Sequence, residues 1–289
     1  PSYNLFKKIN TAATVMDLCH RDFPEFPEVK NDFEYEYREK ILENLNKNIL
    51  IIVESNELRE EISRIYNIQN SKIFNLPNAY SEDHHELNLK KNNSQEFLNF
   101  IKLLPKKYFF YPAQYWPHKN HKILLEAANL LNNKGIKKKF VFCGNDMGNI
   151  TYLKKKVREL NLSKNFIFFN FLGNDEVKYL YKNCEAVVMP TFFGPTNIPV
   201  FNSWYYKKII FYSSHLKNKF EECAVYCDPL EPLSWADALS EFDINKEYYQ
   251  NILINSSNML LDVQEQRNKG LKDMSDYLTR YKKIISSYL

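Results

Sequence analysis

Between residues 106 and 250, short apolar runs alternate with segments of helical periodicity, and this alternation restricts the fold more than any other feature of the sequence. Residues 166–169 are apolar throughout, as expected of a strand. Apolar side chains then recur at intervals of three and four over residues 177–184, which is typical of an amphipathic helix. Strands that alternate with helices in this way predict an α/β fold with a doubly wound parallel sheet.

The segment before this region predicts a second, smaller sheet. Its expected strands are 12–18, 48–53 and 72–76, and its expected helices are 33–45 and 57–66. With only three strands, one edge of this sheet would be bare unless another segment covers it. We therefore expect a partial Rossmann-like domain (1–90), a linker with a short helix near 95–104 (91–105), a complete Rossmann-like domain (106–250) and C-terminal helices that pack back on the first part (251–289, the last of them 271–288).

Composition excludes several classes of protein. Hydrophobic residues make up 44% of the 289 residues, enough for buried cores, and the net charge of +4 is not that of a nucleic-acid binder. The five cysteines are an odd number and lie mostly in apolar segments, which predicts buried, reduced thiols in a cytoplasmic protein. No apolar run approaches the roughly 18 residues that span a bilayer. Because the chain begins with Pro1, we expect it to be a piece of a longer product.

A ligand site is expected where the strands of the larger sheet end, because open parallel sheets bind ligands at that edge. Residues 190–204 predict the end of a strand, a polar turn and a helix with Pro199 in its first turn, where a missing N–H costs nothing. Thr196 and Asn197 stand where short polar side chains cap a helix. Such a turn offers free N–H groups to an anion, usually a phosphate. The alternative is an ordinary β–α connection.

Two further strand ends point to the same edge. Residues 111–121 place Lys119 beside the start of a helix, and residues 143–149 carry two glycines. Neither stretch matches GxGxxG or a P-loop, so neither nucleotide fingerprint applies. Taken alone, Lys119 is equally well read as a solvated lysine.

A metal site is not expected. Cys223, Cys227 and His215 lack a fourth ligand at standard spacing, and the sequence holds no Asp-x-Asp pair of the kind that binds a nucleotide through a divalent ion. The lysine clusters 137–139 and 154–156 are expected to be solvated, although an anionic membrane surface could also use them.

Several long motifs together resemble glycosyltransferase family 4, whose members are retaining enzymes of the GT-B fold, and more narrowly its mannosyltransferase-like branch. They occur in the family's order and spacing over nearly the whole chain: DLCHRDFPEFPEV (17–29), YPAQYWPHKNH (111–121), FCGNDMGN (142–149), LYKNCEAVVMPTFFGPTNIPV (180–200) and CDPLEPLSWADAL (227–239). The resemblance implies that the first half of the N-terminal domain is missing here. It also implies that the final helix crosses back onto the first domain.

The resemblance further implies roles for individual residues. Lys119 matches the residue that neutralises the donor diphosphate, and Asp17, His20 and Arg21 match the acceptor-side motif; Lys119, Asp17 and His20 are the implied catalytic residues. The implied donor-binding residues are Gln114, Lys119, Gly144, Asn145, Asn149, Leu172, Gly173, Gly194, Pro195, Thr196, Asn197, Ile198 and Asn202.

Two positions depart from the family pattern. Asn202 stands where the family has a glutamate that holds the ribose, and Met16 stands where many members have a histidine near the reacting centre. An amide can still hydrogen-bond a hydroxyl, but it lacks the charge that strengthens such a bond.

The expected function is therefore transfer of a hexose, with mannose as one candidate, from a nucleotide sugar to a glycan or glycolipid with retention, as in polysaccharide biosynthesis. GDP-mannose or a UDP-sugar would be the donor substrate, with no cofactor and no metal. The expected location is cytoplasmic, with peripheral contact to the inner face of the membrane. The alternatives are a degenerate GT-B module that binds a nucleotide sugar or a partner without turnover, and an unrelated Rossmann-type binding protein.

Overall fold

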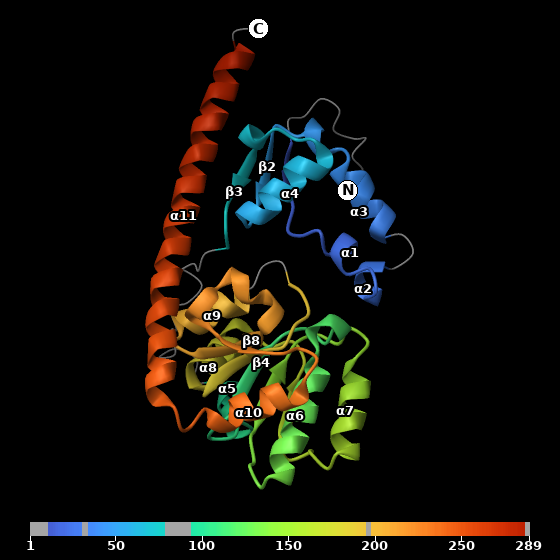
Figure 1. Cartoon of the computed structure of the whole chain (residues 1–289), viewed down its shortest axis with the longest axis vertical. Coiled ribbons are helices and arrows are strands. Elements are labelled where there is room, and N and C mark those ends of the chain that lie inside the picture. Colours follow the sequence, from blue (N-terminus) through green and yellow to red (C-terminus); the bar gives the residue numbers. More distant parts are fainter. Residues whose placement is uncertain (1–10, 31–33, 79–93, 195–197, 287–289) are drawn as a thin grey trace. The chain divides into compact units, whose positions relative to one another are not determined.

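The computed structural model describes residues 11–30, 34–78, 94–194 and 198–286, and the chain divides into two compact units (Figure 1). In the described part, unit 1 comprises 11–78, Gly194 and 261–286, and unit 2 comprises 94–193 and 198–260. Each unit contains its own parallel sheet.

Unit 2 contains a six-stranded, fully parallel sheet, as predicted for a doubly wound fold. Its strands lie side by side in the order β6-β5-β4-β7-β8-β9. Their bounds are β4 (Phe109–Pro112), β5 (Phe140–Cys143), β6 (Phe166–Phe169), β7 (Ala186–Met189), β8 (Ile209–Ser213) and β9 (Val225–Cys227).

Helices cover both faces of this sheet. Successive side chains of a strand point to opposite faces. In β4, Phe109 packs against Phe242 at the end of α10 (Pro232–Glu241), with ring centroids 5.6 Å apart. Its neighbour Phe110 packs against Tyr181 of α8 (Asn174–Asn183) at 5.0 Å. Coverage on both sides explains why these strands are apolar throughout.

The remaining helices of unit 2 follow the predicted alternation. They are α5 (Gln95–Lys102), η4 (Pro117–Lys119), α6 (His121–Asn133), α7 (Ile150–Glu159) and α9 (Ile198–Tyr205), with Pro199 in the first turn of α9 as predicted. The alternation also predicts a helix over 216–222, and this prediction is wrong in type, because two 3-10 segments stand there, η5 (Ser214–Lys219) and η6 (Glu221–Cys223). The backbone of Glu221 has a φ of 42°, in the left-handed region, which an α-helix cannot pass through.

Unit 1 contains three parallel strands in the order β1 (Ala12–Thr14), β2 (Leu50–Val53) and β3 (Ile73–Asn75). Its helical segments are α1 (Cys19–Asp22), α2 (Pro27–Lys30), α3 (Glu34–Leu42), η1 (Leu45–Lys47), α4 (Asn56–Tyr66) and η2 (Asn70–Lys72). The first strand is shorter than predicted, because the chain turns into α1 after Asp17, whose Oδ1 accepts a hydrogen bond from the N–H of Cys19 at 2.9 Å.

One long helix, α11 (Lys246–Ser286), forms the C-terminal region, so the expectation of a separate final helix at 271–288 is wrong. Residues 261–286 of α11 belong to unit 1. There Arg267 donates from Nη1 to the carbonyl oxygen of Pro77 at 2.9 Å, and the Tyr277 hydroxyl donates to the carbonyl oxygen of Ile49 at 2.8 Å. This part of α11 therefore lies against β3 and the segments around the small sheet (Figure 1).

Candidate functional site

The strand order of unit 2 creates a switch point between β4 and β7. After β4 the chain continues to β5 and β6 on one side, whereas after β7 it continues to β8 and β9 on the other. The connections therefore diverge at the carboxyl ends of these two strands, which is where open α/β sheets bind ligands. We call the segments of unit 2 that follow β4, β5, β6 and β7 (113–120, 144–149, 170–173 and 190–193) the carboxyl rim.

The segments after β4 and β7 are joined directly. The backbone N–H of Phe192 donates to the carbonyl oxygen of His118 at 2.9 Å, and the ring of Phe193 stacks on that of His118 with centroids 4.1 Å apart. From the segment after β8, the His215 ring nitrogen Nε2 lies 2.6 Å from the carbonyl oxygen of Phe192. The sequence had offered His215 only as a metal candidate, and its contact with a loop carbonyl has no signal in the sequence.

Lys119 lies in the same part of the rim, in the short segment η4. The buried Tyr111 hydroxyl donates to the carbonyl oxygen of Lys119 at 2.8 Å, and the N–H of Lys119 donates to the carbonyl oxygen of Trp116 at 3.1 Å. These bonds fix the backbone of Lys119 within the segment after β4.

His121, the first residue of α6, is a neutral part of the support beneath the rim. Its ring is fully buried between Tyr111 and Tyr115, with centroids 4.5 and 5.0 Å away. Burial, helped by the charge of Lys119, lowers the pKa of His121 to about 3. The imidazole is therefore uncharged at neutral pH, and the positive charge at this point of the rim belongs to Lys119.

The segment after β5 packs closely against the segment after β4. The N–H of Tyr115 donates to the carbonyl oxygen of Asn145 at 3.0 Å, and Gly144 lies so close that a Cβ on it would stand 2.3 Å from the carbonyl oxygen of Ala113. Asp146, which the sequence analysis did not single out, accepts from the N–H groups of Gly148 and Ile150 with Oδ1, at 2.9 and 3.2 Å. It therefore caps the start of α7, and Asn149 makes no side-chain cap there.

Gln114 is oriented by a residue that sequence reasoning missed. The indole N–H of Trp116 donates to Oε1 of Gln114 at 2.9 Å. This bond engages the amide oxygen and so orients the Gln114 side chain. Leu172 and Gly173 follow β6, and Gly173 is the N-cap residue of α8.

The last group of predicted donor residues surrounds the start of α9. Ile198 is its first helical residue, and Asn202 hydrogen-bonds through its side chain to Tyr181, whose hydroxyl is buried. Gly194 follows Phe193 directly, and Pro195, Thr196 and Asn197 lie outside the described residues. The donor-binding roles of all these residues stay predictions.

The three predicted acceptor-side residues lie in unit 1, within a network of ion pairs. Asp17 accepts from Arg38 at 2.9 Å. The buried His20 places Nε2 2.6 Å from Oε1 of Glu39, and Arg21 donates from Nε to the same oxygen at 2.6 Å. Their catalytic and acceptor roles stay predictions, and the structure shows that each side chain already has a carboxylate or guanidinium partner.

Glu39, at the centre of this network, is expected to stabilise unit 1 in a pH-dependent way. The Arg21 guanidinium holds the pKa of Glu39 at about 2, below its usual 4.5, so the contribution is present above about pH 4.5 and is lost as the pH falls toward 2. We expect Glu39→Gln to lower the free energy of unfolding by about 1.5 kcal/mol at neutral pH, because the substitution removes the charge that pairs with Arg21. The Glu39 side chain is only 15% exposed, so water screens this ion pair only in part.

Urea unfolding at neutral and at acidic pH measures this contribution. The difference between wild type and Glu39→Gln is expected to shrink in acid. Glu36→Gln, an exposed position on the same helix, is the matched control and should change little. An equal loss in both variants would contradict the assigned role of Glu39.

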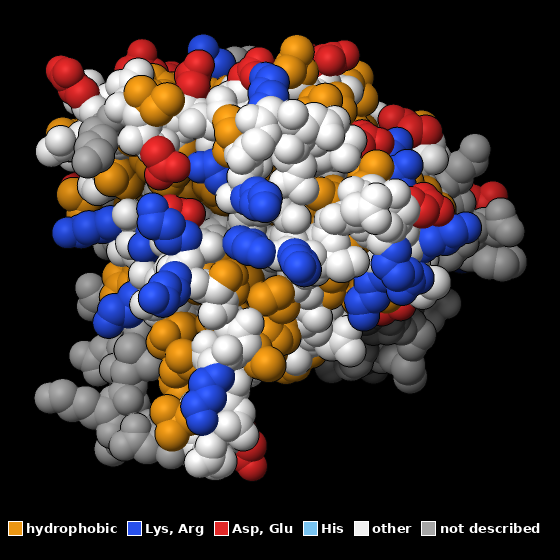
Figure 2. Space-filling view, turned by 90° about the horizontal axis from the view of Figure 1, so that it is seen from below, with side chains coloured by type: hydrophobic (Ala, Val, Ile, Leu, Met, Phe, Trp, Pro, Cys, Tyr) orange, Lys and Arg blue, Asp and Glu red, His pale blue; other side chains and the backbone are white. Residues whose placement is uncertain are grey.

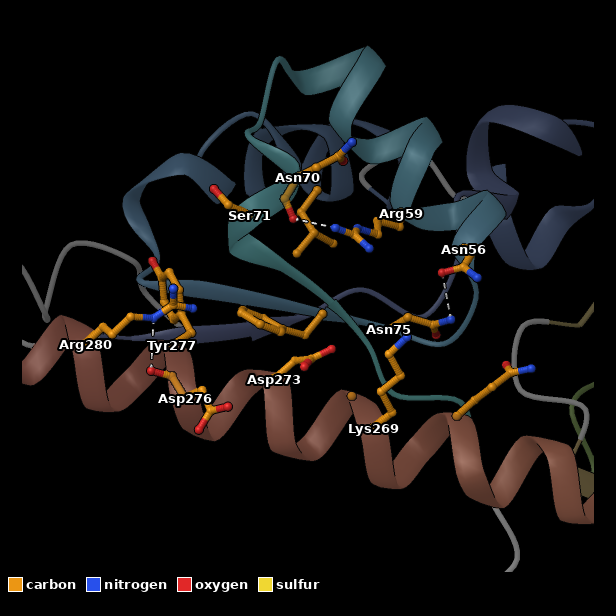
Figure 3. Close-up of a pocket in the computed structure, with 14 residues that line it drawn as sticks. Asn56, Arg59, Asn70, Ser71, Asn75, Lys269, Asp273, Asp276, Tyr277 and Arg280 are labelled. Carbon is orange, nitrogen blue, oxygen red and sulfur yellow. Dashed lines mark hydrogen bonds between the residues drawn. The ribbon is translucent and has the colours of Figure 1, made fainter.

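Unit 1 also contains a pocket of about 420 Å³ between α4, β3 and α11 (Figure 3). Arg59 approaches it from α4, and Lys269, Asp273 and Arg280 from α11. None of the predicted site residues lines it.

The structure provides no metal-binding cluster in the part of the chain that it describes: no group of three or more His, Cys, Asp and Glu side chains is placed to hold an ion. All five cysteines are buried free thiols, as predicted. Burial raises the pKa of Cys143, next to the rim, to about 11, so this thiol is protonated at neutral pH and is not a nucleophile.

Comparison with solved structures defines the class of fold as GT-B. A sucrose-phosphate synthase from Thermosynechococcus elongatus superposes with a TM-score of 0.73 and 13% identity over 97% of this chain and 71% of that one. Anabaena HepE, solved in complex with UDP and glucose, superposes with a TM-score of 0.69 and 12% identity over 92% and 72%. At these identities the likeness concerns the fold alone.

Sequence comparisons point to glycosyltransferases. Residues 94–219 match the model of the family described as Glycosyl transferases group 1. An uncharacterized glycosyltransferase of Methanocaldococcus jannaschii is 24% identical over 152 residues, which are 51% of this chain and 38% of that protein. Residues 94–219 are thus similar to group 1 glycosyltransferases, the fold is GT-B, and the chain aligns with less than half of that archaeal relative.

Proposed function

We propose that this protein is a glycosyltransferase that transfers a hexose from a nucleotide sugar to a glycan or glycolipid acceptor with retention. The single observation that carries the proposal is the switch point between β4 and β7, within residues that match group 1 glycosyltransferases, with Lys119 in the segment after β4 and α9 in the segment after β7. The solved complex of HepE with UDP and glucose supports a nucleotide sugar as donor. Mannose from GDP-mannose and a sugar from a UDP-sugar are both candidates.

The reaction needs electrostatic help at the leaving group. Breaking the bond between the sugar and the diphosphate leaves negative charge on the diphosphate while the sugar becomes oxocarbenium-like. The Lys119 ammonium would neutralise part of that charge, and the first N–H groups of α9 would donate to the phosphate oxygens. Preorganised groups of this kind often make the largest contribution to catalysis. The Gln114 amide, oriented by Trp116, would donate to a polar group of the donor.

The buried support of the rim keeps this charge in place. The neutral His121 and the hydrogen bond from Tyr111 fix the Lys119 backbone without adding a second positive charge. No metal takes part in this scheme, because the ammonium and the N–H groups supply the positive potential.

Nucleotide binding by the whole chain tests the proposal. Titration with UDP, GDP, UDP-glucose and GDP-mannose, followed by thermal shift and calorimetry, should reveal at least one ligand. Lys119→Gln is expected to weaken its binding by about tenfold or more, because one charge-assisted contact is lost. Lys122→Gln, an exposed lysine three residues further on that pairs with Glu126, should bind as wild type does. Equal affinity in the Lys119 and Lys122 variants would refute the role of Lys119.

A further inference from the structure

The edge of the unit 2 sheet opposite the carboxyl rim carries a concentration of lysines that the proposed function does not use. Nine lysines and one carboxylate, Glu185, stand in the four residues that precede each of the adjacent strands β6, β5, β4, β7 and β8. We call these lysines the lysine face: Lys106, Lys107, Lys137, Lys138, Lys139, Lys164, Lys182, Lys207 and Lys208. Because the strands are parallel, all of them begin at one edge.

The charge is not spread evenly over the unit. In the four residues that follow the same five strands, only Lys217 is basic and only Asp146 is acidic. Seen from below, Lys and Arg side chains lie across the middle of this face, whereas the acidic side chains gather toward its margin (Figure 2). Glu221 and Glu222 precede the sixth strand, β9, so the positive charge is concentrated at the starts of the other five strands.

Internal ion pairs neutralise only part of the lysine face. Lys107 pairs with Glu185 at 3.4 Å and Lys138 with Asp243 at 2.8 Å. Lys208 donates to the carbonyl oxygen of Cys184 at 2.8 Å, which leaves its charge in place. Among the described residues, no carboxylate lies within 4 Å of the other lysines of the face, which are Lys106, Lys137, Lys139, Lys164, Lys182 and Lys207.

Two large apolar side chains stand exposed beside these charges. Leu103, which precedes Lys106 by three residues, is 63% exposed, and Ile244, which follows the Asp243 partner of Lys138, is 79% exposed. The face contains no arginine and no exposed aromatic ring among its lysines, whereas specific protein interfaces and nucleic-acid sites favour both. Lysines beside exposed aliphatic residues fit the surface of an anionic bilayer, where the charges meet headgroups and the apolar side chains enter the interface.

We propose that the lysine face docks unit 2 onto an anionic lipid bilayer. The face lies at the opposite edge of the sheet from the carboxyl rim, so docking leaves the rim uncovered. The proposal does not depend on the transferase activity, and its test contains no sugar donor.

Vesicle co-sedimentation of the whole chain is the test, with phosphatidylcholine vesicles that contain or lack phosphatidylglycerol. Wild type is expected to bind only the anionic vesicles and to be released by high salt. Combined Lys106→Gln, Lys137→Gln, Lys164→Gln and Lys182→Gln should lower the partition coefficient at least about tenfold. All four sites are solvent-exposed, so the variant is expected to fold.

A matched variant removes the same charge elsewhere on unit 2, through Lys122→Gln, Lys154→Gln, Lys155→Gln and Lys178→Gln, and it should retain most of the binding. A second variant, Leu103→Ser with Ile244→Ser, keeps every charge and is expected to bind more weakly and to need less salt for release. Equal losses in the two lysine variants, or no binding of wild type to anionic vesicles at low salt, would overturn the proposal. Retention on heparin without vesicle binding would do the same and would assign the face to a soluble polyanion.

Discussion

Gly144→Ala is expected to destabilise unit 2 by about 3 kcal/mol, the largest effect of any substitution considered. A Cβ at this position would lie 2.3 Å from the carbonyl oxygen of Ala113 and 2.6 Å from Cα of Gln114. Both neighbours are backbone atoms, and the N–H of Tyr115 bonds to Asn145 in the same place, so the segment after β4 cannot yield locally. Gly144 does not have a positive φ, so the requirement is for space and not for an unusual backbone conformation.

Urea unfolding of the whole chain measures this loss, and Gly173→Ala is the matched control on the same rim. There a Cβ would meet only the carboxylate end of the Glu176 side chain, at 2.7 Å, which can swing away. Alanine is a poorer N-cap than glycine, so we expect a loss of no more than about 1 kcal/mol. If the proposed function is right, Gly144→Ala also weakens nucleotide binding, because it displaces the segment that carries Gln114 and Lys119. Similar stability in the two variants would show that the backbone at Ala113 and Gln114 shifts at little cost to make room for the added Cβ.

The strands of unit 2 were predictable because their signal is local. The apolar run 140–143 coincides with β5, which is buried at every position, and the apolar run 166–169 coincides with the edge strand β6, which is buried at Phe166 and half-buried beyond it. That ligands bind at the carboxyl edge also follows from parallel topology, whereas the place of the switch point between β4 and β7 depends on the strand order, which only the structure gives. In contrast, the type of structure at 214–223 depends on the left-handed backbone of Glu221, which no periodicity reveals.

The connections within the candidate site were not predictable, because they join residues far apart in the sequence. The bond between Phe192 and His118 and the contact of His215 with Phe192 depend on how two loops meet at one sheet edge. Glu39 stands in a charged helix that appears unremarkable in the sequence, yet it is the partner of both His20 and Arg21. Family resemblance named residues on the rim, and only the structure shows which groups orient them, as Trp116 does for Gln114.

Gly270→Ala is expected to destabilise unit 1 by about 2 kcal/mol, although the same substitution in an isolated helix would stabilise it. Within a helix, alanine is favoured over glycine by about 1 kcal/mol. In α11, however, a Cβ on Gly270 would lie 2.2 Å from the carbonyl oxygen of Asn75 in β3 and 2.7 Å from Cδ2 of Leu76. The overlap with a backbone atom costs about 3 kcal/mol. This cost exceeds the gain in helix propensity, so the net effect of the substitution is destabilising.

The neighbouring contacts decide how unit 1 responds to Gly270→Ala. Relief of the overlap requires α11 to move away from β3, which would stretch the hydrogen bonds of Arg267 and Tyr277 to the carbonyl oxygens of Pro77 and Ile49. We therefore expect faster proteolysis of residues 261–286 together with the loss of stability measured in urea. Ser275→Ala, an exposed position in the same helix, is the control and should be neutral or slightly stabilising. If Gly270→Ala also proved stabilising, helix propensity would outweigh the contact, and α11 would not be held against β3 at this point.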